Sequence, residues 1–136
     1  MEEQQNTELY ALCRKLLENN PYCNYNHMTL GEVREDAVEL YTELTPELTN
    51  IYGMAHGGMM CALADTCAGL TVRMDGNRHV TLDINIRYYA NVKSGRITAR
   101  SSVVKRGKTV NVMNVKVSSD DDTVLAEATV SFFRIG

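Results

Sequence analysis

The stretch GGMMCALADTCAGLTV, residues 57–72, decides the fold of this chain. Alanine, leucine and methionine dominate it, and these residues favour a helix. Because the helix is apolar nearly all round, we expect it to lie inside a core. Asp65 lies in its middle and is the only charged residue between Glu47 and Arg73. An unpaired carboxylate in such a place costs several kcal/mol, so we expect the protein to use this charge.

Asp65 also has a purely structural interpretation. Its side chain could reach the surface if the helix is only partly covered, or it could cap a neighbouring turn through hydrogen bonds. Buried carboxylates occur in purely structural hydrogen-bond networks as well as in active sites. The residues just before the helix favour the functional interpretation.

Those residues are Ala55-His56-Gly57-Gly58. Glycine lets a ligand approach the backbone closely. The first amides of a helix have no partner inside it and point outward at the positive end of the helix dipole. Such an end binds anions or stabilises an oxygen that becomes negative in a transition state. The alternative is that Gly57 and Gly58 only allow a tight turn into the helix.

Length and composition indicate one globular domain. We expect residues 1–27 to form an N-terminal helix and loop, and residues 28–136 to form the core domain. Hydrophobic residues make up 44% of the chain, charged residues 23%, and the net charge is −3. The scattered basic residues do not predict a nucleic-acid partner. The acidic, polar N-terminus lacks the pattern of a signal peptide, and Asp65 argues against a membrane span, so we expect a cytoplasmic protein.

The cysteines and histidines do not predict a metal site. Cys13, Cys23, Cys61 and Cys67 form no CxxC pair, and they do not cluster with the three histidines at metal-ligand spacing. We interpret the cysteines as small core residues of a protein in a reducing compartment. No cofactor is expected.

Hydrophobic periodicity predicts an α+β fold. We expect helices at Thr7–Asn19 and 57–72, an irregular segment at Pro21–His27, and a strand at Val33–Leu44. Four further strands follow, joined mostly by tight turns, at 80–88, Ile97–Lys105, Thr109–Ser118 and 124–132. The apolar phase slips between Val112 and Met113, which predicts a bulge in that strand. Consecutive hairpins make an antiparallel sheet, and only the helix at 57–72 is apolar enough to be its central, wrapped element.

The alternation of the strand at 80–88 assigns a polar face to Thr81, Asp83, Asn85 and Arg87. We therefore expect Thr81 to point away from the central helix. We interpret Asp83, Asn85 and Arg87 as residues that face solvent or another subunit.

Distance sets a condition on any joint action of Gly57 and Asp65. The two residues are eight apart, which is about 12 Å along a helix axis. One substrate carbonyl cannot touch both ends of that span. If the two act together, Gly57 of one helix must meet Asp65 of another, as in a two-fold dimer with antiparallel helices and two equal sites.

The sequence resembles the hotdog-fold acyl-CoA thioesterases, and within them the phenylacetate-pathway thioesterase (PaaI) group and thioesterase superfamily member 2. Three segments carry the resemblance: NIYGMAHGG at 50–58, ALADT at 62–66 and VTLDINI at 80–86. The resemblance covers about residues 28–134. It implies the hotdog fold, in which an antiparallel sheet wraps around one long helix, dimerisation through sheet edges, and often a dimer of dimers.

The resemblance also implies hydrolysis of an acyl-CoA thioester to a carboxylate and free coenzyme A. The Gly57 amide would polarise the thioester carbonyl, and Asp65 of the partner chain would act as general base or as nucleophile. Asn50 would place the water or the substrate, and His56 would orient the loop or the thioester group. Thr81 occupies the position of a supporting Ser or Thr in relatives.

Coenzyme A carries phosphates, so basic residues are expected near the mouth of the site. The turn Arg106-Gly107-Lys108 is similar to a Gly-Lys turn of the family and is a candidate for the nucleotide end. The alternative is an ordinary charged hairpin turn. Two other functions remain open on the same fold: an acyl-CoA binding or sensing protein without catalysis, and a hydratase or dehydratase.

Overall fold

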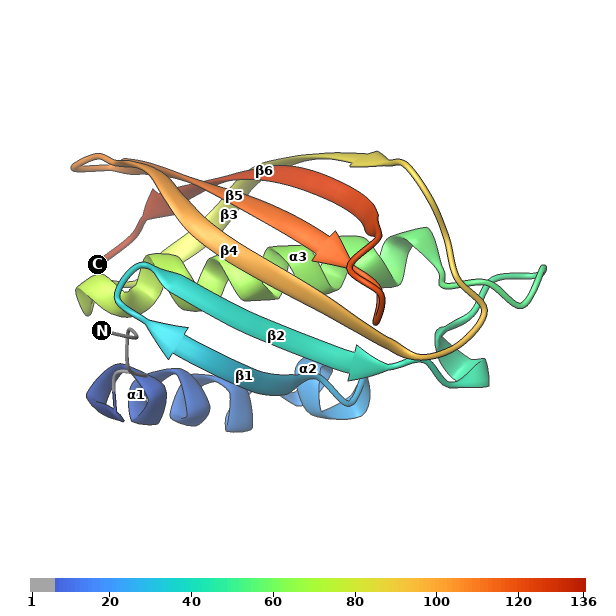
Figure 1. The fold of residues 1–136 in the computed structure, drawn as a ribbon. Coiled ribbons are helices and arrows are strands. Elements are labelled where there is room, and N and C mark those ends of the chain that lie inside the picture. Colours follow the sequence, from blue (N-terminus) through green and yellow to red (C-terminus); the bar gives the residue numbers. More distant parts are fainter. Residues whose placement is uncertain (1–6) are drawn as a thin grey trace, which may run out of the picture.

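The computed structural model describes residues 7–136, so the first six residues of the expected N-terminal segment lie outside it. In the described chain, six antiparallel strands form one curved sheet that wraps around the long helix α3 (Gly57–Val72) (Figure 1). The spatial order of the strands is β1-β2-β4-β5-β6-β3, which leaves β1 and β3 at the edges. The strands are β1 (Thr29–Arg34), β2 (Ala37–Glu43), β3 (His79–Tyr88), β4 (Arg96–Arg106), β5 (Val110–Ser118) and β6 (Val124–Arg134). This is the predicted α+β arrangement.

Helix α3 has the predicted bounds and fills the inside of the sheet. Its buried residues lie on all sides of the helix, as expected for a helix that is apolar nearly all round. They pack on the inward residues of the central strands, among them Ala99, Val115 and Val130. A 3₁₀ turn, η2 (Arg73–Asp75), continues the helix. Another, η1 (Pro46–Leu48), precedes the loop that leads into it.

The N-terminal segment contains two helices. Helix α1 (Thr7–Glu18) is present as predicted and packs beside β1 (Figure 1). The segment after it was expected to be irregular, but Pro21–Tyr25 forms the short helix α2. Asn20 caps this helix by accepting a hydrogen bond from the Cys23 N–H at 3.3 Å, and Pro21 occupies its first turn, where proline is tolerated. These two residues also end α1, which is why the pattern indicated only a stop.

The prediction of a single strand at Val33–Leu44 was wrong. The chain forms a hairpin there, with β1 and β2 joined at Glu35 and Asp36. Asp36 adopts the left-handed conformation, with φ of 60°, which the turn needs. Aspartate tolerates this conformation better than most residues, but Glu-Asp is a weaker turn signal than Asn-Gly or Asp-Gly.

The irregularity expected in β5 lies on the neighbouring strand. Residues 111, 113, 115 and 117 all face inward, so β5 keeps its phase. Opposite the step from Met113 to Val112, strand β4 carries one extra residue, Val104, between Val103 and Lys105. The phase change in the sequence of β5 therefore predicted a bulge at the correct level of the sheet, but the bulge lies on the neighbouring strand β4.

Candidate functional site

Asp65 and Thr81 meet on the inner side of the sheet. Asp65 is half-buried on α3, and its Oδ1 accepts a hydrogen bond from the Thr81 hydroxyl at 2.7 Å. The expectation that Thr81 points away from the helix was wrong. Because its hydroxyl binds one carboxylate oxygen, the second oxygen of Asp65 stays available to a ligand or a water molecule.

A bulge explains why alternation misplaced Thr81. Strand β3 carries an extra residue, Leu82, where Thr81 pairs with Phe132 and Asp83 pairs with Ser131. A side chain of a strand changes face at every residue, so one unpaired residue reverses the phase. Before the bulge, the buried His79 and the exposed Thr81 both lie on the inner side of the sheet. After it, the partly buried residues are Ile84 and Ile86, and the polar residues between them are exposed.

The start of α3 is built by His56 and the two glycines. His56 is the N-cap, and its Nδ1 accepts a hydrogen bond from the Gly58 N–H at 2.9 Å. A Cβ atom on Gly58 would lie only 3.0 Å from the His56 ring, so glycine makes room for this cap. His56 thus fixes the start of the helix. Whether Gly58 and His56 contact a substrate stays a prediction.

Gly57 leaves its amide open. Its N–H donates no hydrogen bond to any atom of residues 7–136, whereas its carbonyl oxygen accepts one from the Tyr88 hydroxyl at 2.5 Å. The Tyr88 ring lies 3.5 Å from the position that a Gly57 Cβ would take. An unpaired N–H at the positive end of a helix is the donor that a developing oxyanion requires.

Asn50 organises the loop before the helix. Its Oδ1 accepts hydrogen bonds from the N–H groups of Tyr52 at 2.9 Å and Met54 at 3.1 Å. Its side-chain oxygen is therefore engaged inside the loop. Asn50 and His56 line one open hollow at the surface, together with Ile51. The expected role of Asn50 in placing water or substrate stays a prediction.

Arg106 serves the other end of α3. Its guanidinium donates to the carbonyl oxygens of Thr71 at 3.0 Å and Val72 at 3.2 Å. It also pairs with Asp36 at 2.7 Å and lies 3.7 Å from Asp75. Arg106 is thus the last residue of β4 and a cap of the helix C-terminus, not part of a free basic turn.

Gly107 and Lys108 follow Arg106 in the turn between β4 and β5. A Cβ on Gly107 would lie 2.3 Å from the Val110 carbonyl oxygen, so the turn itself requires glycine there. Lys108 is exposed. Its contact with the nucleotide end of coenzyme A stays a prediction.

A cavity of about 600 Å³ opens beside Asp65, between α1, α3 and β3. Its apolar lining includes Leu12 and Leu16 of α1 and Leu70 of α3, and its polar lining includes Thr81 and Arg73. Sequence reasoning did not find Arg73. The available signal was its spacing of eight from Asp65, which places both residues on the same side of a helix.

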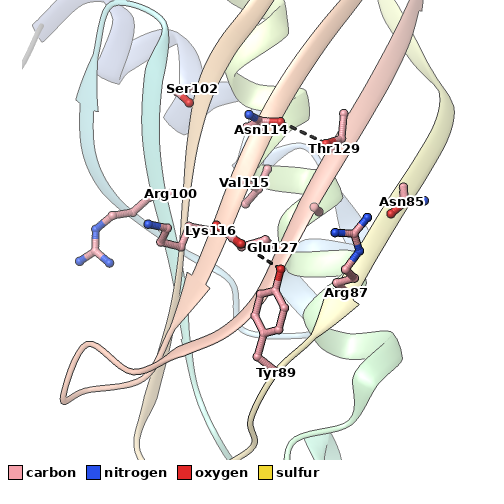
Figure 2. Close-up of a pocket in the computed structure, with 11 residues that line it drawn as sticks. Asn85, Arg87, Tyr89, Arg100, Ser102, Asn114, Val115, Lys116, Glu127 and Thr129 are labelled. Atoms are coloured by element: carbon pink, nitrogen blue, oxygen red, sulfur yellow. Dashed lines mark hydrogen bonds between the residues drawn. The ribbon is translucent and has the colours of Figure 1, made fainter.

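A second hollow, of about 400 Å³, lies on the outer face of the sheet (Figure 2). Its lining is polar and charged, with Arg87, Arg100, Lys116 and Glu127 standing on neighbouring strands. Asp83, Asn85 and Arg87 are exposed on this side, as predicted.

The remaining predictions concern cysteines, metals and membranes. Cys13, Cys23 and Cys67 are buried and Cys61 is half-buried; all four thiols are free. Burial raises the pKa of Cys67 to about 12, which makes its thiolate inaccessible at neutral pH. Among residues 7–136, no three His, Cys, Asp or Glu side chains are grouped as a metal site would need. None of the helices described is both long enough and apolar enough to span a bilayer.

The sequence matches the Thioesterase superfamily over residues 52–126. A candidate esterase of Haemophilus influenzae is 29% identical over 91 residues, which are 65% of this chain and 66% of that protein. The medium/long-chain acyl-CoA thioesterase YigI of Salmonella typhimurium is 27% identical over 93 residues, 57% of this chain and 60% of that protein.

Among solved structures, the PaaI protein of the E. coli phenylacetic acid degradation operon has the same fold, with a TM-score of 0.91 at 19% identity. The superposition covers 98% of this chain and 97% of PaaI. Both the sheet wrapped around α3 and the family match agree with the expected hotdog architecture. The chain belongs to the thioesterase superfamily, a family of thioester hydrolases, and it has the hotdog fold that it shares with PaaI.

Proposed function

We propose that the protein hydrolyses acyl-CoA thioesters to a free acid and coenzyme A. The observation that carries the proposal is the Thr81–Asp65 hydrogen bond, which holds a half-buried carboxylate in a cavity large enough for a small ligand. The open Gly57 amide supplies the second group that thioester hydrolysis needs.

In this mechanism, Asp65 takes a proton from a water molecule as that water attacks the thioester carbonyl carbon. Thr81 donates to Oδ1 and so orients the carboxylate. The carbonyl oxygen becomes negative and binds the Gly57 N–H. The C–S bond then breaks, and the coenzyme A thiolate leaves and takes up the proton. Direct attack of Asp65 on the carbonyl, through a mixed anhydride that water then hydrolyses, uses the same residues.

The two groups act together only across a homodimer. They are eight residues apart on one straight helix, so about 12 Å separates their turns. Strand β3 is an edge strand with exposed Val80 and Leu82, which supports pairing with a second copy along this edge. In the proposed dimer, Gly57 of each protomer faces Asp65 of the other.

The first test measures free thiol release from a panel of acyl-CoAs. We expect Asp65→Asn to lower kcat by about 10²- to 10⁴-fold while the fold persists. Asp83→Asn, which changes an exposed carboxylate on the outer face of β3, is the matched control. Binding without turnover in the wild type would favour the sensing function. Loss of a 2,3-double bond without thiol release would favour a hydratase.

Shared sites predict complementation. Asp65→Asn and Gly57→Pro are each expected to be nearly inactive, but a mixed dimer of the two regains one intact site. Equal mixing and reassociation should therefore restore about one quarter of wild-type activity. No recovery, in a mixture shown to contain mixed dimers, would contradict the shared site.

The dimer of dimers implied by the resemblance finds support on the outer face of the sheet. One row of charges crosses five strands, each residue paired with the next: Glu39, Arg100, Lys116, Glu127 and Arg87. A two-fold axis parallel to β5 reverses this row. It then sets Glu39 against Arg87 and Arg100 against Glu127 of a second copy, with Lys116 at the centre.

Charge reversal tests this second interface. We expect Arg100→Glu to convert tetramers into dimers, and the double variant Arg100→Glu/Glu127→Arg to restore tetramers, as measured by light scattering. A wild-type protein that is only dimeric, or a tetramer that both variants leave unchanged, would refute the interface.

A further inference from the structure

The cavity beside Asp65 is closed on one side by helix α1. Leu12 and Leu16 of α1 face Leu70 of α3 and Phe132 of β6 across it, so its wall is partly apolar. Its volume of about 600 Å³ lies within the range of small-molecule sites. If Asp65 acts on a thioester carbonyl, as proposed above, the acyl group attached to that carbonyl has this cavity directly beside it.

Arg73 introduces a positive charge into this cavity. Its guanidinium is half-buried and donates to the His79 carbonyl oxygen at 2.8 Å. It lies over Gly69, where a Cβ atom would be only 2.5 Å from Nη1. Glycine at this position therefore lets the arginine fold back toward Asp65, to about one helical turn away, roughly 5 Å along the axis.

No carboxylate of residues 7–136 forms an ion pair with Arg73. By contrast, Arg14, Arg96, Arg100 and Arg106 all have carboxylate partners within 2.5–2.8 Å. Burial lowers the pKa of Arg73, and the negative charge of Asp65 opposes this effect from a distance. A half-buried guanidinium with unused donors is costly unless an anion joins it.

The cavity has further polar groups near Arg73. Lys15 of α1 lines it and adds a second positive charge, and Asn19 and Asn20 contribute amides. Asp65 is the only carboxylate in the lining, and the proposed mechanism already uses it. Apart from Asp65, the charged residues of the lining, Lys15 and Arg73, are therefore both positive. They lie on the side of the cavity where the end of an acyl group would be.

We infer that this cavity binds the acyl group and that Arg73 selects acyl groups with a distal carboxylate, that is, the half-thioesters of short dicarboxylic acids. The acyl carbonyl lies at Asp65, the methylene chain contacts Leu12, Leu16 and Leu70, and the distal carboxylate pairs with the guanidinium. Arginine suits this role because its planar fork binds a carboxylate through two hydrogen bonds. The inference rests on the proposed function.

The test compares adipyl-CoA with hexanoyl-CoA, which have equal carbon number and differ in the terminal carboxylate. For the wild type, we expect kcat/KM to be at least about tenfold higher for adipyl-CoA. In Arg73→Met, we expect the ratio of the two kcat/KM values to fall by about 10- to 100-fold, the range for a lost hydrogen bond to a charged group. Arg73→Lys should restore part of the preference, because it keeps the charge without the fork.

Arg78→Met is the matched control. Arg78 is exposed, five residues beyond Arg73, and does not line the cavity. The ratio should not change in this variant. A wild type that hydrolyses hexanoyl-CoA without preferring adipyl-CoA, or an Arg73→Met variant that slows both substrates equally, would overturn the selectivity and leave the proposed function intact. A wild type that hydrolyses no acyl-CoA would instead overturn the proposed function.

A measurement on the wild type alone avoids any folding defect of the variants. Adipate and hexanoate are the acid products of the two substrates. As competitive inhibitors of hydrolysis, adipate should act at a concentration at least about tenfold lower than hexanoate. Equal inhibition by the two acids would contradict an anion subsite at Arg73.

Discussion

The two ends of α3 differ in how their backbone groups are satisfied. At the C-terminal end, the carbonyl oxygens of Thr71 and Val72 accept hydrogen bonds from Arg106, which is itself held by Asp36. At the N-terminal end, the Gly57 N–H donates to no atom of residues 7–136. Helix ends normally find partners for these groups. The comparison teaches that the closed end uses its backbone groups for stability, whereas the open end keeps a free donor, to which we assign the proposed oxyanion.

Among changes at the two ends of α3, the largest expected effect comes from removing the open amide. Gly57→Pro deletes one N–H, and proline is tolerated in the first turn of a helix. His56 already has the extended conformation that precedes a proline, with φ of −69° and ψ of 129°. We expect kcat for acyl-CoA hydrolysis to fall by about 10²- to 10³-fold, as for a lost oxyanion donor, with an unchanged circular dichroism spectrum.

Gly57→Ala is the control for this prediction, because it keeps the N–H. Its Cβ would contact the Tyr88 ring at 3.5 Å, an ordinary van der Waals distance. Activity should stay within a few-fold of the wild type. A Gly57→Pro variant that remains active would show that the open amide is not the oxyanion donor.

Breaking the closed end should affect stability instead of turnover. Arg106→Met leaves two helix carbonyls and Asp36 without their partner. We expect the free energy of unfolding to fall by about 1–3 kcal/mol in urea titrations. The turnover of the folded enzyme should not change. Lys105→Met, at the adjacent exposed position, should leave the free energy of unfolding nearly unchanged. Equal losses in both variants would contradict the capping role.

A smaller effect concerns Asp75, which also serves the closed end. Burial would raise the pKa of this carboxyl, but hydrogen bonds from Asn77 and His79 outweigh it and hold the pKa below its usual range. The folded state thus favours the charged form. This stabilisation is complete above the unfolded pKa of about 3.9, and it is lost as the pH falls through the lower folded value.

Asp75→Asn should therefore cost stability at pH 7, and the difference from the wild type should shrink as the pH falls below about 4. Chemical denaturation at a series of pH values measures this difference. Asp83→Asn is the exposed comparison. A difference for Asp75→Asn that stays constant from pH 7 to pH 3 would show that the carboxylate charge does not stabilise the closed end.

Much of the fold could be predicted from periodicity. Helix α3 could be predicted because its sequence is apolar nearly all round. The alternation of Ala126, Ala128 and Val130 correctly predicted the inner face of β6. The hairpin of β1 and β2 was missed because Asp36 adopts its left-handed conformation without a glycine beside it. A turn of this kind depends on backbone geometry more than on residue type.

The site was less predictable, since it depends on contacts between distant segments. Asp65 and the open start of α3 could be identified from a lone charge and two glycines. The orientation of Thr81 could not, because the bulge at Leu82 is set by the pairing of β3 with β6. Arg106 likewise reads as part of a turn until β4 brings it to the end of α3. Arg73 could be recognised as a candidate only from the cavity that it lines, and α1 forms one wall of that cavity.

The unpaired residue Leu82 makes β3 sensitive to changes in length as well as in chemistry. The strand turns its first half toward the Asp65 carboxylate and its second half toward the core, and one additional residue provides the offset between these two tasks. Deleting any single residue from 80 to 83 would remove the bulge and give a regular hydrogen-bond ladder with β6. The strand could then keep either Thr81 beside Asp65 or Ile84 and Ile86 in the core, but not both. A one-residue deletion at this point is therefore expected either to move the Thr81 hydroxyl away from Asp65 or to turn Ile84 and Ile86 out of the core.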